Sequence, residues 1–118
     1  PGTLSEVTRM LGARRINILA LTLSEGIDHG YVRMVVDRHD EAARLLKKTG
    51  HLVLERDVIL LEMANRPGCL ARVTDLWAKA RLNIEYAYCA NTPGVDEGLV
   101  VIRVEDTAKA LKILKLEI

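Results

Sequence analysis

The stretch LLEMANRPGCLARVTDLWAKARLNIEYAY, residues 60–88, decides the fold of this chain. A run of apolar residues ends at the turn sequence Asn-Arg-Pro-Gly, and Leu70, Val73 and Trp77 then recur at the spacing of one helix face. The residues after Asn83 alternate between larger and smaller or polar side chains, as in a half-buried strand. The stretch therefore predicts a strand, a tight turn, a helix with Trp77 in the core, and a second strand.

The same pattern occurs at the start of the chain, 66 residues earlier. This shift is even, so that equivalent side chains keep the same face of a strand. The chain is therefore interpreted as two copies of one structural unit. Identical positions at this shift include Pro1/Pro67, Gly2/Gly68, Leu4/Leu70, Val7/Val73, Thr8/Thr74, Arg15/Arg81, Asn17/Asn83, Ile18/Ile84, Asp40/Asp106, Ala42/Ala108 and Leu45/Leu111.

Each copy predicts the same order of elements. Thr3-x-x-Glu6 is typical of a capping box that opens the first helix, and Asp40 and Asp106 are plausible N-caps of the second helix of each copy. The order strand–helix–strand–strand–helix–strand is the split βαβ, or ferredoxin-like, plan. The fold class is therefore α+β, an α/β sandwich of antiparallel sheets with helices on one face. Strands are expected at 16–24, 30–37, 82–90 and 98–104, hairpin turns at 24–30 and 91–98, and two further strands within 51–65, the second at about 57–64.

The first unit is expected at residues 1–56 and the second at 57–118. The first begins after its opening strand, and the second ends at LKLEI, where its last strand would start. We expect the native chain to carry further residues before Pro1. In the first unit Ile18 and Ala20 are expected on one strand face, and Leu19, Leu21 and Leu23 on the other. Such a leucine face would need a cover, from the other unit or from a second chain.

Composition excludes several classes of function. The 118 residues are 49% hydrophobic and 28% charged, with a net charge of +1, which gives no reason to expect nucleic acid or a membrane as partner. No apolar run approaches the roughly 18 residues of a membrane-spanning helix, and a cytoplasmic location is the default. The two cysteines lack metal-ligand spacing and are expected to be reduced and buried. No catalytic pair, phosphate loop, metal or cofactor site is predicted.

Residues 60–88 resemble the opening of an ACT domain: a strand, Asn-x-Pro-Gly-x-Leu, a helix, and Asn-Ile entering the next strand. The first copy matches from its Pro-Gly onward. The resemblance covers essentially the whole chain as a tandem pair. It implies a ferredoxin-like regulatory module without catalysis of its own. ACT domains typically bind an amino acid where two such domains meet, and pass that signal to an enzyme. We therefore expect a free amino acid as ligand and a homodimer as the assembly.

The resemblance to serine-binding ACT domains implies that Asn65 and Asn83 bind the ligand. A His often precedes the first asparagine by two places in that family, and here the position is Met63, which favours a less polar ligand than serine. Asn83 is expected to lie close to the Asn-Arg-Pro-Gly turn in the fold. The expected ligand-binding residues are Asn65, Arg66, Pro67, Gly68, Cys69, Leu70, Asn83 and Ile84, with Asn17 and Gly2 in the first copy.

The residues themselves support this site but leave a plainer interpretation open. An amino acid carboxylate needs N–H donors, which a helix N-terminus supplies, and Gly68 lets a ligand approach the backbone. The turn could equally be a well-made connection from strand to helix with no ligand.

Two further functions compete with an amino acid sensor. The chain could dock on a biosynthetic enzyme as an assembly or regulatory subunit that binds no ligand. RNA binding also fits the topology, but it needs aromatic side chains in an RNP-like arrangement, which this sequence lacks.

Overall fold

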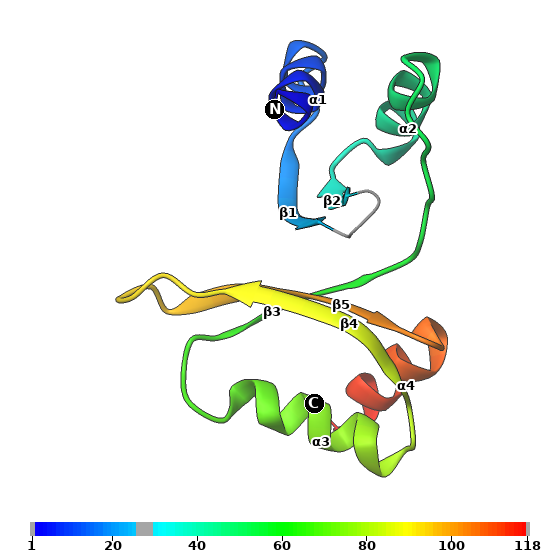
Figure 1. The fold of residues 1–118 in the computed structure, drawn as a ribbon. Coiled ribbons are helices and arrows are strands. Elements are labelled where there is room, and N and C mark those ends of the chain that lie inside the picture. Colours follow the sequence, from blue (N-terminus) through cyan, green and yellow to red (C-terminus); the bar gives the residue numbers. More distant parts are fainter. Residues whose placement is uncertain (1, 26–29, 118) are drawn as a thin grey trace. The chain divides into compact units, whose positions relative to one another are not determined.

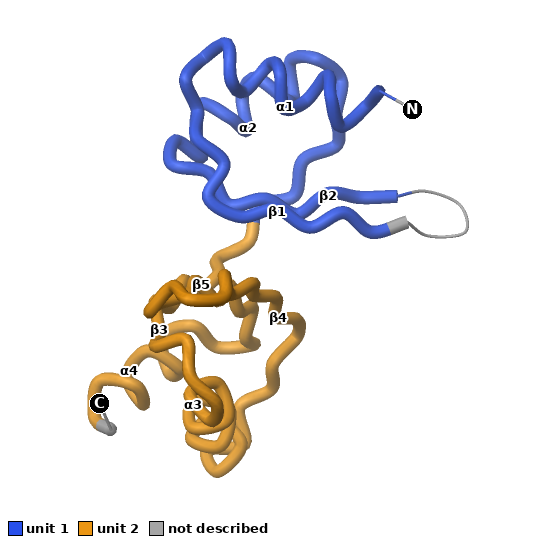
Figure 2. Tube along the Cα trace, turned by 90° about the vertical axis from the view of Figure 1, so that its left-hand side faces the viewer, with its two compact units in different colours: residues 1–55 blue, residues 56–118 orange. Residues whose placement is uncertain are grey.

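The structure is a computed structural model that describes residues 2–25 and 30–117. Pro1 and most of the predicted turn at 24–30 lie outside the described residues. The chain forms two compact units, residues 1–55 and 56–118 (Figure 2). Each unit has its own hydrophobic core, so each is described by itself.

The first unit is a hairpin that carries two helices on one face (Figure 1). Its strands pair antiparallel, and the helices pack on them through Val7, Leu11 and Ala42, joined by Ile16 from the connection between α1 and β1. Leu11 is fully buried, as the helical spacing predicts. The elements are α1 (Thr3–Ala13), β1 (Ile18–Glu25), β2 (Gly30–Val36) and α2 (His39–Lys48).

The second unit is an antiparallel sheet of order β3-β5-β4 with two helices on one face (Figure 1). Trp77 is 0% exposed, which confirms its predicted place in the core. Around it pack Ile59 and Leu82 together with Ile102 and Val104 of the central strand. The elements are β3 (Ile59–Ala64), α3 (Cys69–Lys79), β4 (Ile84–Ala90), β5 (Glu97–Val104) and α4 (Thr107–Glu117).

These two units confirm the predicted fold class, α+β with antiparallel sheets and helices on one face. Four of the predicted strands, at 16–24, 30–37, 82–90 and 98–104, form within two residues of their expected bounds. Across the described residues, no helix combines the length and the apolar character that crossing a membrane requires.

Two predicted strands do not form. Residues 51–58 have no regular structure, and only the second strand predicted within 51–65 is present, as β3. Leu52 and Leu54 are 91% and 70% exposed. A strand needs a partner, and among the described residues of the first unit only β1 and β2 pair with each other. At the other end, α4 continues to Glu117, where the last strand was expected to start.

The predicted faces of β1 are also wrong, because a bulge interrupts the strand. Ile18 pairs with Val36 and Ala20 with Val35, which leaves Leu19 as the extra residue. One extra residue moves every later side chain to the opposite face. Leu21 and Leu23 therefore share the helix-side face with their partners Met34 and Val32, so the expected face of three leucines opposite the helices is wrong. Leu19, Leu21 and Leu23 are nevertheless all exposed, as that prediction required. Ile84 and Tyr86 flank an equivalent irregularity in β4.

Smaller corrections concern the caps and one cysteine. The N-cap of α1 is Gly2, so Thr3-x-x-Glu6 is not a capping box, and α2 begins at His39 with Arg38 as N-cap, so Asp40 is not a cap. Asp106 is confirmed, because its Oδ1 accepts the Lys109 N–H at 3.0 Å. Cys89 is exposed rather than buried, because β4 lies at the edge of its sheet.

Candidate functional site

Asn65 immediately follows β3 and ties the turn to the loop between β4 and β5. Its backbone N–H donates to the carbonyl of Asp96 at 2.7 Å. Its carboxamide Nδ2 donates to the carbonyls of Thr92 and Val95 at 3.1 and 2.9 Å. Both N–H groups of the side chain are therefore used within the unit, and Oδ1 is the carboxamide atom left for other contacts.

Gly68 gives the turn its shape through its backbone conformation. Its φ is 89°, in the left-handed region that side chains disfavour, and an added Cβ would meet nothing within 4 Å. Gly68 is therefore required by conformation, whereas the sequence interpretation invoked close approach of a ligand. Pro67 precedes it, and the Cys69 N–H donates to the Arg66 carbonyl at 3.3 Å.

The N-terminus of α3 lies open behind this turn. Gly68 is the N-cap and has no side chain, and within the described residues no side chain caps the helix. The N–H groups of Leu70 and Ala71 therefore point out of the helix without a capping acceptor. With the helix dipole, they form a site that favours an anion such as a carboxylate.

A shallow depression lies beside the turn and is acidic. Its lining residues are Glu62, Glu97, Gly98 and Leu99. Ala64, the residue before Asn65, pairs with Glu97 across the sheet. Leu61 and Met63 pack against the core on the helix side, so Glu62 and Glu97 project from the opposite face of the sheet, near the end of β3 that leads into the turn.

Asn83 lies at the opposite end of the sheet, so the expectation that it is close to the turn is wrong. Its N–H donates to Oε1 of Glu105 at 2.9 Å, and its carbonyl accepts the Glu105 N–H at 3.1 Å. Asn65 is bonded to Asp96 instead. Asp96 and Glu105 are nine residue steps apart, and a strand rises about 3.3 Å per step, so about 30 Å separates the two asparagines.

The side chain of Asn83 is exposed, and within the described residues it makes no hydrogen bond. Ile84, in contrast, is half-buried and packs against the core of the unit. The predicted site residues therefore divide into two groups. The turn, from Asn65 to Leu70, forms one, and Asn83 forms the other.

The first unit repeats the second down to individual hydrogen bonds. Gly2 is the N-cap of α1 with φ 91°, matching Gly68. The Asn17 N–H donates to Oδ1 of Asp37 at 3.0 Å, and the Asp37 N–H returns to the Asn17 carbonyl at 3.1 Å, as between Asn83 and Glu105. The Asn-Ile step of each copy is therefore held by an acidic residue after the return strand. The sequence repeat does not predict this partner. Asp37 and Glu105 are different amino acids, and they lie 68 positions apart instead of the 66 of the repeat.

Arg15 and Arg81 occupy a left-handed backbone position that the sequence pattern does not predict. They follow α1 and α3 and have φ of 56° and 57°, the only positive values among the described non-glycine residues. After α3, the Leu82 N–H bonds to the Trp77 carbonyl at 2.9 Å and the Arg81 N–H to the Ala78 carbonyl at 3.0 Å. This pattern is a Schellman motif, which normally places glycine at the left-handed position. The available signal was the Arg15/Arg81 identity of the repeat.

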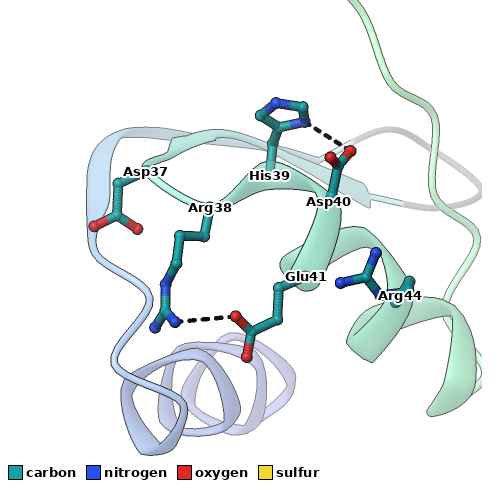
Figure 3. Close-up of a pocket in the computed structure, with 6 residues that line it drawn as sticks. All are labelled: Asp37, Arg38, His39, Asp40, Glu41 and Arg44. Carbon is teal, nitrogen blue, oxygen red and sulfur yellow. Dashed lines mark ion pairs between the residues drawn. The ribbon is translucent and has the colours of Figure 1, made fainter.

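A second depression lies at the start of α2 in the first unit and was not predicted (Figure 3). Its lining residues carry charges of both signs, with Arg38 paired to Glu41 at 3.0 Å and His39 Nδ1 to Asp40 at 3.2 Å. A ligand atom of Glu55 lies within 4.8 Å of ligand atoms of His39 and Asp40. These three exposed side chains could hold a divalent cation. Lining the depression are Asp37, Arg38, His39, Asp40, Glu41 and Arg44.

One titratable group outside these depressions has a displaced pKa. Hydrogen bonding with Ser24, and then the hydrogen bond and charge of Arg33, lower the pKa of Tyr31 below its usual value. The Arg33 guanidinium lies 4.6 Å from the centre of the Tyr31 ring and donates to its hydroxyl at 3.2 Å. Because Tyr31 shares the face opposite the helices with Arg33, this pair belongs to neither of the two predicted groups of site residues.

The chain matches one protein family and is similar to two solved structures described below. The family described as ACT domain pair matches residues 1–117. A crystal structure of a protein from Bacteroides thetaiotaomicron is 34% identical, with a TM-score of 0.90 over 98% of this chain and 79% of that one. The ligand-free regulatory subunit of aspartate kinase from Thermus thermophilus shares the fold at 20% identity, with a TM-score of 0.70 over 98% and 83% of the two chains. No curated protein matches the chain.

Proposed function

The chain belongs to the ACT domain pair family, and we propose that it is a regulatory module that binds a free amino acid and has no catalytic activity of its own. The aspartate kinase regulatory subunit of Thermus thermophilus, which shares the fold, supports a role in controlling a metabolic enzyme. The observation that carries the proposal is the open N-terminus of α3 at the Asn65–Gly68 turn.

The turn offers complementary groups to both ends of an amino acid. The N–H groups of Leu70 and Ala71 favour the carboxylate, since they lack a capping acceptor at the positive end of the helix dipole. Oδ1 of Asn65, the carboxamide atom that the loop leaves without a partner, suits the ammonium group.

Asn83 can contact an amino acid bound at the Asn65–Gly68 turn only if that turn belongs to another unit. An amino acid is far shorter than the roughly 30 Å between the two asparagines of one unit. We assign Asn83 to the site formed with the turn of a second copy of the chain, so that a homodimer carries complete sites. The exposed, unbonded carboxamide of Asn83 supports this assignment, because it is available to a ligand or a neighbour.

Thermal shift with each of the free amino acids, followed by calorimetric titration, tests this function. A ligand at about 100 times its Kd stabilises the protein by about 2.7 kcal/mol, which raises the melting temperature by several degrees. Asn83→Ala should weaken binding at least tenfold, because hydrogen bonds to a charged group contribute about 1.5–3 kcal/mol. Asn17→Ala, the same substitution in the first copy, reports whether that copy also binds.

The absence of a shift with every amino acid would overturn the sensor function. That result would favour the alternative, a subunit that docks on a biosynthetic enzyme and binds no ligand itself. If binding persists unchanged in Asn83→Ala, the amino acid lies elsewhere in the protein.

A further inference from the structure

Arg81 keeps a side chain at a backbone position that favours glycine. Its φ is 57° at the end of α3, and Arg15 has the same conformation at the end of α1. The equivalent position after α2 is Gly50, with φ 90°, so the chain does use glycine in this motif. Strain retained at two equivalent positions points to a use for the side chain.

The surroundings of Arg81 leave its positive charge uncompensated within the unit. Glu105 accepts the Asn83 N–H and Asp106 caps α4, while Glu85 pairs with Arg103 at 3.0 Å. These three carboxylates are thus already engaged. Lys109 adds a further cation, since its Nζ donates to the carbonyl of Ala80, the neighbour of Arg81, at 3.3 Å. The guanidinium of Arg81 makes no hydrogen bond or ion pair within the described residues.

The opposite end of the same sheet is acidic. Glu62, Asp96 and Glu97 lie beside the Asn65 turn, are exposed, and make no side-chain hydrogen bond or ion pair in the part of the chain that the structure describes. Arg66 is the cation of the turn itself. The second unit therefore carries free carboxylates at one end and a free guanidinium at the other, about 30 Å away along β5.

We propose that Arg81 binds the carboxylates of Glu62 and Glu97 in a second copy of the chain, and so brings Asn83 of one copy to the Asn65 turn of the other. This pairing rests on the two-copy site of the proposed function. Two copies related by a two-fold axis place each acidic end against a basic end, so one interface contains the contact twice. Complementary charge of this kind selects the partner and its orientation. Arg81 is therefore a positioning residue for the site.

Charge reversal with rescue tests the pairing in the full chain. Arg81→Glu places like charges at both equivalent contacts and should weaken self-association at least tenfold, measured by sedimentation equilibrium. Glu62→Arg and Glu97→Arg, added to Arg81→Glu, should restore it. Arg72→Glu, on the exposed side of α3, is the matched control and should leave the association constant within threefold. Circular dichroism and Trp77 fluorescence verify the fold of each variant.

A second variant removes the charge without adding strain. Arg81→Gly relaxes the left-handed turn, so it should fold at least as well as the native chain while its self-association weakens and loses part of its salt dependence.

The outcomes separate this inference from the amino acid function. A monomeric native chain, or an Arg81→Glu variant that associates like Arg72→Glu, would overturn the pairing even if an amino acid binds. Loss followed by rescue would establish it even if no amino acid binds.

Discussion

The indole N–H of Trp77 donates to the backbone carbonyl of Ala110 at 3.2 Å, so one side chain joins α3 to α4 beneath the sheet. Both residues are fully buried. Trp77→Phe removes this hydrogen bond and part of the buried volume, and should destabilise the second unit by about 1–3 kcal/mol. Trp77→Ala should cost about 3–5 kcal/mol. Urea unfolding followed by circular dichroism measures both, and Leu111→Ala, at a partly exposed site on α4, should cost less than about 1 kcal/mol.

Asn65 and Asn83 should differ sharply in their effect on stability. Asn65→Ala removes two hydrogen bonds from the loop between β4 and β5 and should lower the free energy of unfolding by about 1–2 kcal/mol. Asn83→Ala removes an exposed carboxamide without a partner and should stay within about 0.5 kcal/mol. Denaturant titration of Trp77 fluorescence compares them. Equal costs would contradict the two roles that the hydrogen bonds assign.

Arg15 and Gly50 form a matched pair within the first unit, because each takes the left-handed position after a helix. Arg15→Gly relieves the steric cost of a side chain there and should stabilise the unit by about 0.5–1 kcal/mol, after the greater freedom of glycine in the unfolded chain is counted. Gly50→Ala should destabilise it by about 1 kcal/mol or more. Thermal unfolding of both variants checks the opposite signs, and a destabilised Arg15→Gly would show that the guanidinium stabilises the unit.

Asp106 and Asp40, equivalent in the repeat, should behave differently. Asp106→Ala removes the N-cap of α4 and should cost about 1 kcal/mol. Asp40 lies inside the first turn of α2, where its charge favours the helix dipole by only a few tenths of a kcal/mol, so Asp40→Ala should cost less than about 0.5 kcal/mol. Urea unfolding of the two variants measures both losses of stability. Similar losses would contradict this prediction and would indicate that Asp40 also caps its helix.

Local patterns predicted most of the fold correctly. The helical spacing that ends at Leu11 and at Trp77 placed both residues in their cores, and the alternation after Asn83 located β4. The wrong predictions concern strand faces and strand pairing, which one inserted residue or one missing partner strand can change. Leu19 forms a bulge that no composition signal marks, and it reverses the face of Leu21. The expected strand at Leu52 does not form, because a strand depends on a partner as well as on its own residues.

The candidate site shows the same division. The turn at Gly68 was predictable from the sequence, because a left-handed N-cap disfavours side chains and therefore favours glycine at that position. The distance between Asn65 and Asn83 was not, since both flank the same helix and are neighbours in every local description. They are separated because β3 and β4 both run antiparallel to β5, so that β3 ends beside Glu97 while β4 begins beside Val104.

The sequence by itself determined the repeat, the helices with their buried faces and the two glycine turns, because each depends on residues within one or two turns of chain. The tertiary structure alone decided which strand face meets the helices, which polar groups are satisfied, and that the two halves of the candidate site lie at opposite ends of one sheet. These features depend on register and pairing between segments far apart in the chain, and a shift of one residue reverses them without changing any local pattern.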